Sequence, residues 1–167
     1  MLYTAQQIAD YIIADSHDAG SFISNLKLQK LLYYVQAWHL AIFNELLFPE
    51  RFEAWVHGPV IPELYRKYKD YRWRNIDHDV SRPLLDDRTV KFLGEVLDEY
   101  GPLDARRLEW LTHRESPWVN ARERAGVVAD DPCTGLIDET EMRDYYRGRM
   151  EASRVAGTQW DEFGGQG

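Results

Sequence analysis

The sequence has few of the features that mark secreted, metal-binding or membrane-spanning proteins. It contains one cysteine, Cys133, which has no partner for an internal disulfide and cannot form a multi-cysteine zinc site. The start, MLYTAQQIADYII, lacks the basic residues of a signal peptide. The most apolar run, residues 31–43, contains Gln36 and His39 and is too short and too polar to cross a bilayer. We therefore expect a cytoplasmic protein that does not enter a membrane.

The chain has fewer basic than acidic residues. The 20 lysines and arginines are outnumbered by 28 acidic residues, which gives a net charge of −8. This balance argues against a general nucleic-acid-binding protein, which normally carries a basic face. A length of 167 residues with 44% hydrophobic content indicates a single domain with a real core.

Motifs of common enzyme classes are missing. The sequence has no phosphate-binding loop, no G-x-G-x-x-G, no G-x-S-x-G and no H-E-x-x-H. A zinc-deaminase pattern begins with His113 and Glu115 and continues with Pro132-Cys133, but Leu136 occupies the second cysteine position. We therefore expect no catalytic residue set, no metal and no cofactor, and we do not expect an enzyme.

Helical spacing dominates the chain. Thr4 and Gln7 form a capping box ahead of one helix, and Ser116 is the expected cap of a later one. Residues 25–44 are apolar on nearly all sides, which is typical of a buried helix. The sequence thus predicts an all-α, single-domain helical bundle around a buried central helix. Alternation over residues 52–56 allows one short extended segment.

The stretch EAWVHGPVIPELY, residues 53–65, has three interpretations. His57 could be a general base oriented by Glu53 or Glu63, which would make the chain a small hydrolase. Alternatively, Gly58 and the following prolines could form a structural corner in which His57 bonds a backbone carbonyl. His57 could also contact a partner protein. The residue types favour the structural corner, and the other two interpretations stay open.

A locally basic stretch follows. The basic strip, Tyr65–Arg74, reads YRKYKDYRWR and contains one acidic residue, Asp70. Interleaved aromatics are typical of surfaces on which nucleic-acid bases stack. However, Tyr65 and Tyr68 share the apolar face of the predicted helix with Leu64, so we expect them to pack inward. A nucleic-acid-binding module is therefore the less favoured interpretation, and an acidic protein partner fits equally well.

Two blocks of sequence resemble a known family. Residues 25–69 read NLKLQKLLYYVQAWHLAIFNELLFPERFEAWVHGPVIPELYRKYK, and residues 108–126 read LEWLTHRESPWVNARERAG. Both resemble the SocA-like Panacea domain, which also occurs in phage-associated GepA-like proteins. The later MRDYY, residues 142–146, fits the usual end of that domain. The resemblance covers most of residues 1–150, so we expect a Panacea domain there and a flexible C-terminal tail over residues 151–167.

The resemblance implies an all-helical antitoxin of a toxin–antitoxin system. Such a protein neutralises a cognate toxin protein, expected from the adjacent gene, commonly by direct binding. At least one branch of the family is an adaptor that delivers its toxin to a protease, so a protease is a second partner to test. Aromatic residues and arginines are the usual anchors of such contacts. The residues that we expect to contact the partner are Trp55, His57, Tyr65, Arg66, Trp73, Arg74, Trp160 and Phe163.

Overall fold

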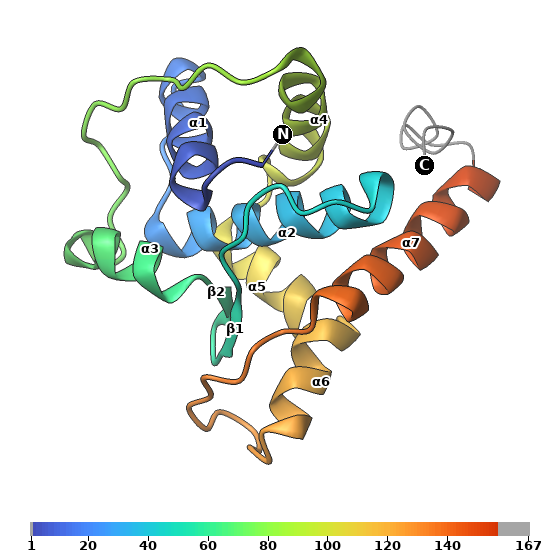
Figure 1. Ribbon diagram of the computed structural model, residues 1–167. Coiled ribbons are helices and arrows are strands. Elements are labelled where there is room, and N and C mark those ends of the chain that lie inside the picture. Colours follow the sequence, from blue (N-terminus) through green and yellow to red (C-terminus); the bar gives the residue numbers. More distant parts are fainter. Residues whose placement is uncertain (1, 157–167) are drawn as a thin grey trace.

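The computed structural model describes residues 2–156, with side chains up to residue 152, and this part of the chain is mostly helical (Figure 1). The elements in order are α1 (Ala5–Asp18), α2 (Asn25–Phe43), β1 (Glu53–Trp55), β2 (Gly58–Val60), α3 (Pro62–Tyr68), the 3-10 turn η1 (Lys69–Tyr71), α4 (Asp87–Tyr100), α5 (Ala105–His113), α6 (Ser116–Arg124) and α7 (Glu139–Ala156). None of the described helices is long and apolar enough to cross a membrane.

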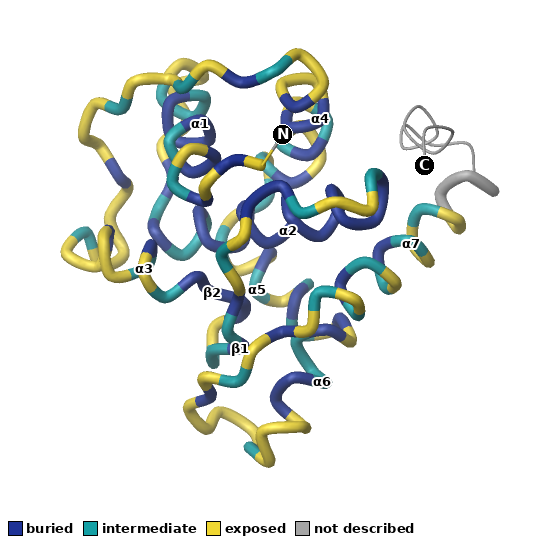
Figure 2. Tube along the Cα trace, in the orientation of Figure 1, coloured by how far each residue is buried: buried dark blue, intermediate teal, exposed yellow. Residues whose placement is uncertain are grey.

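Helix α2 is the centre of the molecule, as its apolar sequence predicted. It contacts α1, α3, α4, α5, α7 and β2, and Figure 2 shows it buried along most of its length. Ser24 caps its start by accepting a hydrogen bond from the Lys27 amide, and Asn44 ends it in the left-handed conformation. Each large apolar side chain buried in this way contributes about 1.5–3 kcal/mol, so packing around α2 accounts for much of the stability.

Side-chain caps define the starts of some of the other helices. The predicted capping box of Thr4 and Gln7 is present at α1, and Asp86 caps α4. The expected cap at Ser116 is wrong, because α6 begins at Ser116 with Glu115 in the cap position. Glu115 makes no capping bond, since its carboxylate turns into the core and accepts hydrogen bonds from the hydroxyls of Tyr34 and Tyr146.

The predicted extended segment is real and forms one half of a small hairpin. β1 pairs with β2 in antiparallel register, with Glu53 opposite Val60 and Trp55 opposite Gly58. The sequence did not predict the second strand, because Pro59 can donate no ladder hydrogen bond and the segment looked like a corner. The hairpin lies below α2 in Figure 1 and carries His57 at its turn.

Helix α7 lies against α2 and completes the bundle (Figure 1). It continues to Ala156. The expected tail contains Trp160 and Phe163, which lie outside the described residues, so the tail and the division near residue 150 stay predictions.

Candidate functional site

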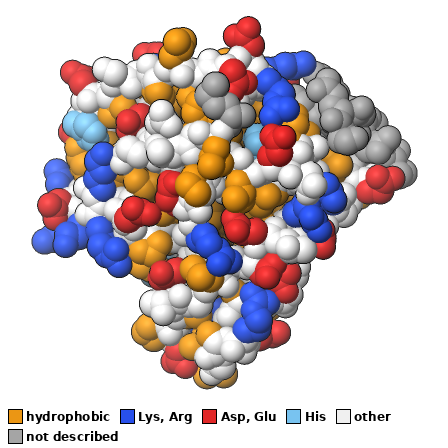
Figure 3. Space-filling view, in the orientation of Figure 1, with side chains coloured by type: hydrophobic (Ala, Val, Ile, Leu, Met, Phe, Trp, Pro, Cys, Tyr) orange, Lys and Arg blue, Asp and Glu red, His pale blue; other side chains and the backbone are white. Residues whose placement is uncertain are grey.

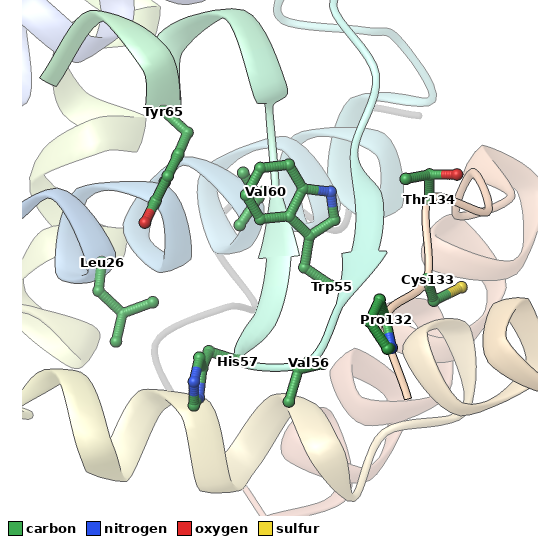
Figure 4. Close-up of a pocket in the computed structure, with 9 residues that line it drawn as sticks. All are labelled: Leu26, Trp55, Val56, His57, Val60, Tyr65, Pro132, Cys133 and Thr134. Carbon is green, nitrogen blue, oxygen red and sulfur yellow. The ribbon is translucent and has the colours of Figure 1, made fainter. Parts of the chain in front are cut away.

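A hollow of about 240 Å³ lies between the hairpin, the start of α2, α3 and the loop before α7. Its lining is mostly apolar and is drawn in Figure 4. Three of the residues expected at a partner contact, Trp55, His57 and Tyr65, line it. Leu26, Val56, Val60, Pro132, Cys133 and Thr134 complete the wall.

Trp55 is held firmly in the middle of this hollow. Its indole packs edge-on against the Tyr65 ring with 5.0 Å between centroids, and its Nε1 donates to Glu53 Oε1 at 2.8 Å. The Trp55 carbonyl accepts a hydrogen bond from Trp118 Nε1 at 2.9 Å. A large aromatic surface that is fixed before binding loses little entropy when a partner covers it.

His57 occupies the rim, and its carboxylate partner is different from the predicted ones. Its Nδ1 lies 2.6 Å from Oε1 of Glu109 on α5, and its side chain is 71% exposed. Sequence reasoning offered Glu53 or Glu63, but Glu53 bonds Trp55 instead. The expected bond from His57 to a backbone carbonyl is replaced by this contact. Glu109 is 52 residues away in sequence, so nothing local could have identified it.

A fully buried lysine on α2 contacts the hairpin, and the sequence did not single it out. Lys30 Nζ donates to the Pro59 carbonyl at 3.0 Å, and burial lowers the pKa of this amine to about 7 despite the opposing effect of Glu109. Gly58 has a φ of +105°, and a Cβ there would lie 2.4 Å from Lys30 Cε. Only glycine fits this turn without displacing the lysine.

The loop that forms the opposite wall is held by a buried arginine. The Arg122 guanidinium donates to the carbonyl oxygens of Ala54 at 2.8 Å and Ala129 at 3.1 Å, and to that of Asp131. This clamp joins α6, β1 and the loop. Cys133 lies on the same loop, is buried, and its Sγ accepts from the Gly135 amide at 3.3 Å. In Figure 4 the sulfur points away from His57.

The basic strip, Tyr65–Arg74, is split by the structure. Tyr68 is buried, as its periodicity predicted, whereas Tyr65 is half-buried against Trp55. Arg66 and Arg74 are exposed, and Trp73 is 80% exposed. Lysine and arginine side chains gather over α3 at the left edge of Figure 3. The strip therefore offers separated anchors and lacks the continuous stacking surface that a run of bases would need.

The tip of the strip is backbone-strained. Arg72 follows η1 with φ 57° and ψ −119°, a conformation that non-glycine residues rarely adopt. It places Trp73 outward between two exposed arginines. Such strain persists where the surrounding structure enforces it and is enriched at functional sites.

A buried polar cluster between the helices has no counterpart in the sequence predictions. Burial raises the pKa of Glu115, which binds the hydroxyls of Tyr34 and Tyr146. The Tyr100 ring stacks on Tyr34 at 4.0 Å, and Trp38 Nε1 donates to the Tyr100 hydroxyl at 2.8 Å. The cluster joins α2, α4, α6 and α7, so it fixes the bundle that supports the hairpin.

Comparisons with known proteins agree with the resemblance seen in the sequence. The family described as "Antitoxin SocA-like, Panacea domain" matches residues 28–119. The chain is 30% identical over 161 residues to a protein named "Antitoxin SocA" from Caulobacter vibrioides (strain NA1000 / CB15N), and the match covers 86% of this chain and 82% of that protein. No solved structure matches the chain.

Proposed function

The chain belongs to the SocA-like antitoxin family with a Panacea domain, and on this premise we propose that it neutralises a cognate toxin protein by binding it directly. The toxin is expected from the adjacent gene. The observation that supports direct binding is the apolar hollow, with Trp55 fixed at its centre and Tyr65 beside it. Aromatic side chains in such pockets are the usual hot spots of protein–protein contacts.

The contact surface of this proposal runs from the hollow along the basic strip. Tyr65 lines the hollow and Arg66 is exposed on the next position of α3. Trp73 and Arg74 follow at the strained tip. Together they provide an apolar socket flanked by positive charge, which suits a toxin segment with an apolar side chain next to acidic residues. Trp160 and Phe163 stay further candidates of the proposal.

Growth rescue tests the function. The adjacent gene is expressed with and without this chain, and rescue is scored for the wild type and for Tyr65→Ala with Arg66→Glu. A matched control, Arg88→Glu with Arg143→Glu, changes two arginines on α4 and α7 that are away from the hollow. We expect the wild type and the control to rescue, and the contact variant to bind the purified toxin at least tenfold more weakly. The proposed function is contradicted if the product of the adjacent gene is harmless, or if it is toxic and this chain does not rescue growth.

The mode of neutralisation is read from toxin abundance. Direct blocking leaves the toxin level unchanged when growth is restored, whereas a proteolytic adaptor lowers it and requires the protease. Truncation after Arg154 removes Trp160 and Phe163. Unchanged toxin affinity in the truncated chain would remove both from the contact surface.

A second candidate function, hydrolysis centred on His57, has one observation in its favour. The 2.6 Å contact with Glu109 would orient the imidazole as a general base. The thiol of Cys133 lines the same hollow but turns away from His57 (Figure 4). His57→Ala separates the two functions. If the chain is an antitoxin, the variant keeps the fold and loses at most part of its toxin affinity. If the chain is a hydrolase, the variant loses turnover and keeps its toxin affinity.

A further inference from the structure

Several arginines of the described chain pair with a carboxylate. These pairs are Arg51–Glu139, Arg82–Asp18, Arg88–Glu45, Arg124–Glu141 and Arg143–Asp144. Arg107 on α5 and Arg114, the residue that caps the end of α5, are arranged differently. Arg107 and Arg114 are exposed, and neither forms an ion pair with a carboxylate of the described residues. Exposed arginines without a carboxylate partner also occur in the basic strip, for example Arg66 and Arg74. Arg107 and Arg114 differ from them because both lie against the same tryptophan ring.

Both guanidinium groups are organised around one exposed tryptophan. The central carbons of Arg107 and Arg114 each lie 4.3 Å from the centroid of the Trp110 ring system, and Trp110 is 45% exposed. Positions 107, 110 and 114 share one face of a helix. We call these three residues the α5 ladder.

The α5 ladder is distinct from the hollow. Leu108 on the same helix is buried in the core, and Glu109 reaches His57 at the hairpin. At 100° per residue, Trp110 lies on a different side of α5 from Glu109 and about opposite Leu108. The ladder therefore faces away from the bundle, and it lies on a different side of α5 from the one that contacts the hairpin.

The stacking leaves the binding edges of both arginines available. A guanidinium that rests on an aromatic ring uses its flat face, so its in-plane N–H groups can still donate to a carboxylate. The two side chains start about 10 Å apart along the helix and converge, since each guanidinium carbon lies 4.3 Å from the same ring centroid. Because the ring holds them in place, less side-chain entropy is lost on binding than for free arginines.

We propose that the α5 ladder is a docking surface for an acidic segment of a protein partner, with two carboxylates that reach the two converging guanidinium groups and an apolar side chain between them that covers Trp110. An extended chain spans about 10 Å in three residues, so a short motif is sufficient. Nucleic acid is the less suitable ligand, since a long polyanion would also meet the repulsive field of an acidic protein. This proposal does not depend on the toxin or on the hollow.

The test uses the fluorescein-labelled peptide EELLEE and its neutral counterpart QQLLQQ, measured by fluorescence anisotropy at low salt. The ladder variant is Arg107→Gln with Arg114→Gln. The matched control is Arg88→Gln with Arg143→Gln, which changes the net charge equally at another place. Far-UV circular dichroism and the melting temperature establish that all variants fold.

We expect EELLEE to bind the wild type and the control alike, and to bind the ladder variant about tenfold more weakly, because two charge-assisted contacts are lost. Trp110→Ala should weaken binding severalfold. Equal affinity of the ladder variant and the control would overturn the proposal. The proposal would also be overturned if QQLLQQ bound the wild type as tightly as EELLEE does. The same holds if a single-stranded oligothymidylate bound through the ladder more tightly than EELLEE.

Discussion

The buried Lys30 makes stability depend on pH in a defined direction. Burial lowers the pKa of its amine in the folded state to about 7, from 10.5 for the free side chain. Between these two pH values the unfolded chain holds a proton on Lys30 that the folded chain has released. Since stability rises with pH wherever the unfolded state binds more protons, the free energy of unfolding should increase from pH 7 upward.

The magnitude follows from the same two pKa values. Each unit of difference corresponds to about 1.36 kcal/mol, and proton linkage between about pH 7 and pH 9.5 gives a gain of about 3 kcal/mol. The range ends there because burial raises the pKa of Tyr34 and Tyr146 well above that of free tyrosine. Above about pH 10 the unfolded tyrosines ionise while the folded ones do not, so stability falls again.

Urea unfolding at pH 7 and pH 9.5 measures this gain in the wild type and in Lys30→Met. Methionine has a similar length and no charge, so the gain should largely vanish, although the Pro59 carbonyl loses its donor. Lys27, whose pKa burial also lowers, provides the control: Lys27→Met should remove a smaller part. A gain in Lys30→Met equal to that of the wild type would refute the reasoning.

Three further changes test the supports of the site, each measured as a shift in the free energy of unfolding. Glu115→Ala leaves the hydroxyls of Tyr34 and Tyr146 without their acceptor and should cost about 2–4 kcal/mol; a cost below about 1 kcal/mol would show that the cluster matters little. Gly58→Ala should cost at least about 3 kcal/mol, since its φ is +105° and the new Cβ would clash with Lys30. The control Gly20→Ala, at φ +68° in open space, should cost only about 1 kcal/mol. Arg72→Gly should stabilise the chain by about 1 kcal/mol by relieving its strained backbone, and a loss of stability would mean that the arginine side chain holds the turn.

The fold was largely predictable because the signals for it are local. An apolar sequence on nearly all sides of residues 25–44 identified the central helix, and the capping box of Thr4 and Gln7 lies within one turn. The error at Ser116 has a physical origin. Glu115 gains more from two buried tyrosine hydroxyls than a surface cap would give, and no local pattern announces tyrosines 31 and 81 residues away.

The candidate site was predictable only in its residue types. The sequence identified Trp55, His57 and Tyr65 as notable, and the structure places all three around one hollow. It could not pair His57 with Glu109, because that contact depends on how α5 crosses the hairpin. The α5 ladder was missed for a different reason: Arg107, Trp110 and Arg114 lie in an ordinary helical segment, and only the exposure of Trp110 and the contact of both arginines with its ring distinguish them.

Because Arg122 binds backbone carbonyls of the loop at the hollow, it holds the path of that loop whatever side chains the loop carries. The guanidinium binds carbonyl oxygens of Ala54, Ala129 and Asp131, and every residue type presents the same carbonyl. Side chains at positions such as Pro132 and Thr134, which line the hollow, can therefore be exchanged while the loop keeps its course. A scaffold with this property can diversify its recognition surface by point substitution, and each new surface is presented without refolding the bundle.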